Sequence, residues 1–224
     1  GTSPALFDDI VVFTHEQWKG GKGKQGAWIA LVRLTGEIRW TTKRNNKQIS
    51  YSTPCVYSPE GREPELIFAS EAHGISGVEP RTGKVIWELD SALPARVVSS
   101  PVIAGDLLIG ACGKGGAGIQ LSAIRPGSED NPGQVTLAYK RTGKTAPYVP
   151  TSIAKDSLLF TFHDQGDVSC LRIETGQVLW SERPGGRFYG SPVWVNGLLY
   201  CINRQGNLLV LKAASAYELL AINS

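Results

Sequence analysis

The sequence predicts an all-β fold, a β-propeller built of four-stranded antiparallel blades. Three observations predict it. A Thr-Gly turn that runs into a tryptophan strand occurs three times, at residues 35–40, 82–87 and 175–180. Apolar runs of strand length alternate with Gly- and Pro-containing turns along the whole chain, and no long segment has the 3.6-residue period of a helix. The copies recur roughly every 40–50 residues, which is the length of a four-stranded propeller blade.

Each repeat unit begins with a Ser-Pro or Thr-Pro pair, at residues 3–4, 53–54, 100–101 and 191–192, while the pair at 151–152 lacks the proline. A second apolar run follows, then a glycine and an alternating segment, and the Thr-Gly turn and the Trp strand close the unit. This pattern predicts one domain, 1–224, with five blades at approximately 1–43, 50–91, 97–141, 149–183 and 188–224.

Two units have lost the tryptophan, and counting along the repeat places Leu137 and Leu220 in its position. In the third unit a longer polar segment, 125–132, replaces the Thr-Gly turn. We expect this segment to form the loosest turn of its kind.

Trp40, Trp87 and Trp180 are predicted to dock one blade onto the next. A single blade cannot cover both faces of its sheet, so neighbouring blades must stack. A buried Trp carries about 150–250 Å² of surface, and its truncation to Ala costs roughly 3–5 kcal/mol. We therefore expect these three residues in the outermost strands, in a structural role.

Composition excludes several classes of function. The net charge of +3 is too small to indicate a nucleic-acid partner. The sequence has no stretch of 18 apolar residues, which is about the length needed to span a membrane. The four cysteines are isolated and are predicted to be small buried hydrophobes, not a disulfide framework. The chain has neither a Met nor a signal peptide, which suggests a mature fragment.

Five units fit either a small closed ring or a piece of a seven- or eight-bladed ring. We favour a piece. An open arc would expose the inner faces of its terminal blades, and further blades or a second copy would have to cover them.

The string Ala30-x-x-x-x-Thr35-Gly36-x-x-x-Trp40 and its two copies resemble the tryptophan-docking motif of the pyrroloquinoline-quinone-like (PQQ-like) repeat propellers. That family includes PQQ-dependent dehydrogenases and non-enzymatic propellers such as the scaffold lipoprotein of outer-membrane barrel assembly. The resemblance covers essentially the whole chain and implies a periplasmic or extracellular location.

The chain departs from the enzymes of that family. It has no vicinal Cys-Cys pair, and the acidic position of the motif is acidic only at Glu79. The resemblance therefore implies a protein nearer the non-enzymatic members, with no cofactor. PQQ with calcium belongs only to the alternative, a fragment of a quinoprotein dehydrogenase.

A binding face is predicted from the topology. In four-stranded antiparallel blades, the inter-blade loops lie on the same side as the connections from the second to the third strand. These loops are rich in Lys, Arg, His and Tyr. The residues predicted to bind a ligand near the axis are Arg44, Lys47, Tyr51, Arg96, Tyr148, Arg187 and Tyr189. The alternative is that exposed loops simply carry such residues.

No catalytic or metal site is predicted. His15-Glu16 and His163-Asp164 lie three blades apart and lack metal-ligand spacing, and no nucleophile–base pair can be assembled. The leading hypothesis is a non-catalytic scaffold that binds a protein segment or an anionic ligand on its basic loop face. The alternatives are the dehydrogenase fragment and a structural arc that completes a larger propeller.

Overall fold

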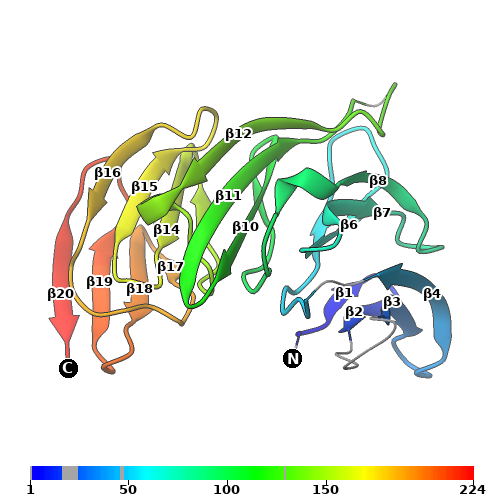
Figure 1. Cartoon of the computed structure of the whole chain (residues 1–224), viewed down its shortest axis with the longest axis horizontal. Coiled ribbons are helices and arrows are strands. Elements are labelled where there is room, and N and C mark those ends of the chain that lie inside the picture. Colours follow the sequence, from blue (N-terminus) through cyan, green and yellow to red (C-terminus); the bar gives the residue numbers. More distant parts are fainter. Residues whose placement is uncertain (1, 17–24, 46–47, 129) are drawn as a thin grey trace.

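The structure is a computed structural model that describes residues 2–16, 25–45, 48–128 and 130–224. In these residues twenty strands form five antiparallel sheets of four, and each sheet contains four strands that are consecutive in the chain. The sheets follow one another around an arc, which Figure 1 shows from β1 in blue to β20 in red. The predicted all-β propeller fold with five four-stranded units is confirmed.

The strands of each blade run from the innermost to the outermost. Blade 1 comprises β1 (Ala5–Phe7), β2 (Ile10–Glu16), β3 (Gln25–Val32) and β4 (Ile38–Asn45). Blade 2 comprises β5 (Cys55–Tyr57), β6 (Glu65–Ser70), β7 (Gly74–Val78) and β8 (Val85–Leu89). Blade 3 comprises β9 (Val102–Ala104), β10 (Leu107–Lys114), β11 (Ala117–Arg125) and β12 (Thr136–Thr142). Blade 4 comprises β13 (Ile153–Lys155), β14 (Leu158–Phe162), β15 (Val168–Arg172) and β16 (Val178–Glu182). Blade 5 comprises β17 (Val193–Val195), β18 (Leu198–Ile202), β19 (Leu208–Lys212) and β20 (Leu219–Asn223). Two short 3₁₀ helices, Asp90–Ala92 and Gly143–Thr145, lie in inter-blade loops.

The core consists of four apolar clusters, and each fills the space between two successive blades. One cluster joins Trp28 and Val12 of blade 1 to Phe68 of blade 2, with the Trp28 and Phe68 rings stacked at 4.2 Å between centroids. The other clusters join blades 2 and 3, 3 and 4, and 4 and 5. Stability is therefore a property of neighbouring pairs of blades, as in other repeat proteins.

The repeated tryptophans occupy equivalent places, as predicted. Trp40, Trp87 and Trp180 are buried in the outermost strands β4, β8 and β16. Each pairs across the ladder with a small residue of the third strand, and a β-bulge follows that pair. The same register places Tyr139 and Ala221 in this position in blades 3 and 5. The prediction of Leu137 and Leu220 was wrong, because the turns before these two strands differ in length from the Thr-Gly turns.

The aromatic residue of one blade docks on the turn of the next. The Trp40 indole N–H donates to the carbonyl of Pro80 at 2.8 Å. Its ring covers Gly83 so closely that a Cβ there would lie 2.5 Å from it. Tyr139 covers Gly176 of blade 4 in the same way. Trp180 donates to the carbonyl of Ala214 in blade 5 at 3.1 Å.

Trp87 is the exception. Blade 3 offers no Thr-Gly turn, and the Trp87 indole N–H donates instead to the buried carboxylate of Glu65 in its own blade, at 2.6 Å. A Cβ on Gly77 would lie 2.2 Å from this indole, so the ring lies back on the sheet of blade 2. The contact between blades 2 and 3 is therefore built differently from the others.

A series of hydrogen bonds joins the Ser/Thr residues that open successive blades. The N–H of Thr53 donates to the hydroxyl of Ser100 at 3.1 Å, and the N–H of Ser100 donates to that of Thr151 at 3.0 Å. The N–H of Thr151 in turn donates to Ser191 at 2.9 Å. We call this series the opener seam. It fixes the spacing of the innermost strands of blades 2 to 5.

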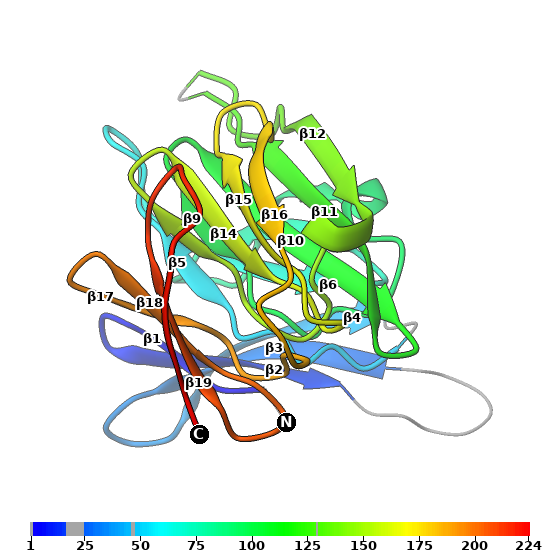
Figure 2. The ribbon, with the colours of Figure 1, turned by 90° about the vertical axis from the view of Figure 1, so that its left-hand side faces the viewer.

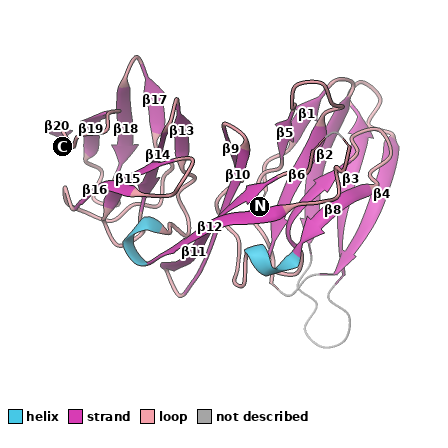
Figure 3. Ribbon diagram, turned by 90° about the horizontal axis from the view of Figure 1, so that it is seen from above, coloured by secondary structure: helices cyan, strands magenta, loops and turns pink. Residues whose placement is uncertain are grey.

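The two terminal blades are open on one side. Val193, Val195 and Ile202 of blade 5 and Leu6 and Ile38 of blade 1 are exposed on the sheet faces that have no neighbour. No hydrogen bond between described residues joins blade 5 to blade 1. Figures 1 and 3 show these blades at the two ends of the arc, and Figure 2 views the arc from the side of blade 5.

The connections divide between two sides of the arc. The loop face consists of the inter-blade loops and the connections from the second to the third strand. The turn face consists of the connections between the first two and the last two strands. On the turn face, residues 126–135 of blade 3 form the longest third-to-fourth strand connection, against 33–37, 79–84, 173–177 and 213–218. The predicted loose turn of blade 3 is confirmed for the residues described there.

Candidate binding faces

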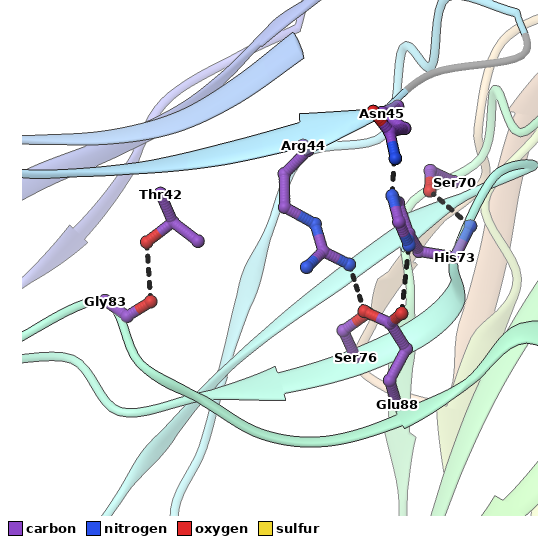
Figure 4. A network of polar contacts seen from close by, with 8 residues as sticks. All are labelled: Thr42, Arg44, Asn45, Ser70, His73, Ser76, Gly83 and Glu88. Atoms are coloured by element: carbon purple, nitrogen blue, oxygen red, sulfur yellow. Dashed lines mark hydrogen bonds and ion pairs between the residues drawn. The ribbon is translucent and has the colours of Figure 1, made fainter. Parts of the chain in front are cut away.

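Arg44 of the predicted set lies in a polar network between blades 1 and 2 (Figure 4). Its guanidinium pairs with the carboxylate of Glu88 and lies 4.1 Å from the centroid of the Trp28 ring. His73 joins the network, with Nδ1 at 2.9 Å from Glu88 and Nε2 at 3.0 Å from the carbonyl of Asn45. The Arg44 side chain is nearly buried. The structure gives it partners within the protein and little access for a ligand.

Burial and charge act in opposite directions on Glu88. Burial raises the pKa of its carboxyl, but the hydrogen bond from His73 and the positive charge of Arg44 outweigh burial and lower the pKa below its usual value. Glu88 therefore carries its charge at neutral pH. The network is an ion-pair clamp between two blades.

Arg96, Tyr148 and Tyr51 come together around the loops that lead into blades 3 and 4. The backbone N–H of Gly113 donates to the carbonyl of Arg96 at 2.9 Å, and Tyr148 packs on Gly113. Burial raises the pKa of Tyr148, while the neighbouring Arg96 charge opposes this rise. Tyr148 is buried, whereas Tyr51 is exposed. Tyr51 and part of Arg96 are therefore the accessible members of this group.

Arg187 and Tyr189 lie on the exposed loop that leads into blade 5. The Arg204 guanidinium lies 4.6 Å from the centroid of the Tyr189 ring, and the N–H of Arg204 donates to the carbonyl of Arg187 at 2.8 Å. Arg204 was not in the predicted set, although it lies in a second-to-third strand connection of the same face. Its partner across the loop could not be identified from spacing. Lys47, also predicted, lies outside the described residues.

Buried acidic groups on this face support the backbone. The Asp164 carboxylate accepts hydrogen bonds from the N–H groups of Tyr148 and Val149 at 2.7 and 3.0 Å. Burial raises the pKa of Asp164 above its ordinary value. Glu16 accepts the N–H of Ser50, and burial raises its pKa to about 7. These carboxyls hold inter-blade loops in place.

No three or more His, Cys, Asp or Glu side chains converge as a metal site among the described residues. The four cysteines are free, and burial raises the pKa of Cys55, Cys170 and Cys201 to about 12. These thiols are protonated and weakly nucleophilic at neutral pH.

A family model described as outer membrane protein assembly factor BamB matches residues 1–145 and 134–219. The chain belongs to this family. Members of the BamB family are thus its relatives by sequence pattern, and the predicted PQQ-like repeat propeller is confirmed. Among curated proteins, no sequence matches the chain.

Solved structures agree on the fold. BamB from Moraxella catarrhalis is similar with a TM-score of 0.64 and 14% identity, over 96% of this chain and 61% of that one. The computationally designed Ika8 protein is similar with a TM-score of 0.67 and 15% identity, over 99% of this chain and 61% of that one. Saccharomyces cerevisiae Sqt1 is similar with a TM-score of 0.70 and 13% identity, over 96% of this chain and 57% of that one. At these identities the similarity shows the fold alone. The chain spans about three fifths of the length of these structures.

No described helix is both long enough and apolar enough to cross a membrane.

Proposed function

We propose that this chain is a non-catalytic scaffold that binds a protein segment through its loop face. The observation that carries the proposal is the exposed group of Arg187, Tyr189 and Arg204, in which the Arg204 guanidinium stacks on Tyr189 and the Arg204 N–H donates to the carbonyl of Arg187. Arg forms bidentate pairs with carboxylates, and Tyr supplies a rigid contact area at low entropic cost. The expected partner is an acidic segment of a protein, and the similarity to the BamB family supports a periplasmic location.

The structure changes which residues we assign to this face. Arg44 and Tyr148 hold the blades together, and Tyr51, Arg96, Arg187 and Tyr189 remain as candidates for contact. Arg204 joins them. The inner strands position all of these loops, so binding should need little rearrangement of the backbone.

The proposal is tested by replacing Tyr189 with the photoreactive residue p-benzoylphenylalanine and cross-linking in a periplasmic extract. We expect a discrete cross-linked partner whose yield falls as salt rises, because the contact is ionic. Arg187→Ala with Arg204→Ala should abolish this product. The matched control is Arg81→Ala with Arg172→Ala, which removes two charges from the turn-face side. Equal cross-linking in both double variants would place the binding site elsewhere.

A second candidate function, a structural arc that completes a larger propeller, is favoured by the exposed apolar residues on the free faces of blades 1 and 5. The two functions use different residues, because the first rests on loop side chains and the second on the free sheet faces of the terminal blades.

A further inference from the structure

We propose that a groove between blades 2 and 3 on the turn face binds a short extended protein segment that carries a basic residue next to an aliphatic one. This site lies on the side opposite the loop face. It is separate from the proposed function there.

The groove forms where two departures from the repeat meet. The first and second strands of blades 1, 3, 4 and 5 are joined by two residues, at 8–9, 105–106, 156–157 and 196–197, whereas residues 58–64 join those of blade 2. The second departure is the connection 126–135 of blade 3. Both lie on the turn face in adjacent blades, as Figure 1 shows near β8 and β12. In repeat proteins, insertions confined to one face commonly form the binding surface.

Trp87 does not line this space. At the other interfaces an aromatic side chain covers the turn of the next blade, but the Trp87 indole donates to Glu65 in its own blade. The hollow between blades 2 and 3 has a volume of about 870 Å³. Both of its walls belong to blades that have neighbours on each side, so the open ends of the arc do not create it.

Arg62 ties the two walls together. Its Nη1 donates to the carbonyls of Gly127 at 2.7 Å and Ser128 at 3.2 Å, and its Nη2 lies 3.5 Å from the Glu65 carboxylate. The Arg62 side chain is only 11% exposed. The charge of Arg62 is balanced by Glu65, and its hydrogen bonds hold the two walls in place, so we do not assign it a contact with the ligand.

The accessible charges of the lining are mainly acidic. Glu60 is exposed, and the Asp106 side chain is 92% exposed with Arg125 at the limit of an ion pair, 4.0 Å away. Glu60 has no ion pair among the residues that the structure describes. The lining contains Glu60, Asp106, Arg62 and Arg125, and because Arg62 is paired with Glu65 its accessible charges are net negative. A Lys or Arg of the bound segment would pair with them.

An apolar strip lies beside these charges. Ile103 is 39% exposed although it belongs to a blade with neighbours on both sides, and Tyr57, which faces blade 3, lines the groove from the opposite wall. These side chains would receive an aliphatic residue of the segment. The groove is largely open to solvent, whereas a small-molecule site typically buries about 70–90% of its ligand. Its size and openness therefore favour a peptide.

The test uses the full chain and a library of random heptapeptides, selected for binding to the chain and counter-selected against the double variant Ile103→Ser with Asp106→Asn. We expect enriched peptides with a basic residue beside an aliphatic one. In fluorescence anisotropy, their dissociation constant should rise at least tenfold in that variant, which corresponds to about 1.4 kcal/mol.

Leu6→Ser with Asp9→Asn is the matched control, because these residues occupy the same strand and turn positions in blade 1. Affinity should be unchanged in this variant and in Arg187→Ala with Arg204→Ala. If no enriched peptide distinguishes the two matched variants, the groove is not a peptide site. Enrichment of acidic peptides would overturn the assigned charge. Circular dichroism melting of each variant separates lost binding from lost folding.

Discussion

At the residue scale, one contact explains most of the repeat. A Thr-Gly turn in this chain does more than reverse the strand: it is a surface onto which the previous blade places an aromatic ring. Gly83 has φ +74° and lies under Trp40, so both its conformation and its contact exclude a side chain. Gly36 has the same φ of +74°, yet no atom lies within 4 Å of the place of its Cβ.

This pair of glycines separates backbone strain from docking. Gly36→Ala should cost about 1 kcal/mol, the penalty of a left-handed alanine. Gly83→Ala should cost clearly more, because the added methyl group displaces the Trp40 ring. The measurement is the free energy of unfolding by urea for each variant of this chain. Equal losses would mean that Trp40 contributes nothing through Gly83.

The buried carboxyl of Glu16 should make stability depend on pH. Burial raises its pKa from 4.5 to about 7, so the folded chain binds a proton more readily than the unfolded chain between these values. The contribution of Glu16 to the free energy of unfolding therefore falls as pH rises from about 4.5 to 7. Glu16→Gln keeps an acceptor for the N–H of Ser50 and removes the titration. Its stability relative to the unmodified chain should increase across this range, and a constant difference would contradict the prediction.

At the element scale, the blade interfaces are alike in plan but not in detail. Blades 1 and 2 have a Trp dock and an ion-pair clamp, and blades 3 and 4 have a Tyr dock. Between blades 2 and 3 the Trp87 ring packs in the apolar cluster, but its N–H donates to Glu65 of its own blade and not to a turn of blade 3. Instead, Arg62 reaches across to the long connection of blade 3. The groove on the turn face lies at this same interface.

The clamp can be measured by a double-mutant cycle. Arg44→Met and Glu88→Gln should show a coupling of roughly 0.5–3 kcal/mol at neutral pH, as expected for residues in direct contact. The lowered pKa of Glu88 means that its stabilising charge is present above pH 4.5 and is lost in more acidic solution. The coupling should therefore vanish in acid. A coupling energy that does not change with pH would mean that it arises from the packing of Arg44 on Trp28 and not from the charge of Glu88.

The sequence predicted the elements well and the contacts poorly, for identifiable reasons. Recurrence of Thr-Gly and Trp at one spacing located three equivalent tryptophans, of which Trp40 and Trp180 dock on a turn of the next blade. The different hydrogen bond of Trp87 was not predicted, because it depends on Glu65 and on the turn of blade 3. The docking position of blade 3 was predicted at Leu137, two residues before the observed Tyr139, since the length of the preceding connection is not encoded in the repeat. The engagement of Arg44 with Glu88 could not be foreseen, because it depends on which residues face each other across two blades. Whether a loop arginine is free or paired is decided by such long-range contacts.

At the scale of the whole molecule, the arc is held together only by contacts between neighbours. The apolar clusters and the opener seam each join one blade to the next, and the outer faces of blades 1 and 5 stay uncovered. The fold similarity to longer propellers fits this arrangement, since those structures contain more chain.

The uncovered faces should make the isolated chain self-associate. Sedimentation velocity at increasing concentration should show a rising weight-average sedimentation coefficient, because exposed apolar strands favour association. Val193→Lys with Ile202→Lys should shift the chain toward monomer. The control variant is Arg172→Lys, which changes an exposed side chain that is already charged. A chain that remains monomeric at all concentrations would contradict the prediction.

The opener seam also has a mechanical consequence. Each of its bonds connects one blade to the next, so a pulling force applied at the two ends of the chain is carried by every junction in series. In a closed ring the load would be shared by two paths, but an arc has only one. Stretching a single molecule should therefore release it in discrete steps, one blade at a time. The junction between blades 2 and 3, where the Trp87 indole makes no hydrogen bond to the next blade, should yield at the lowest force.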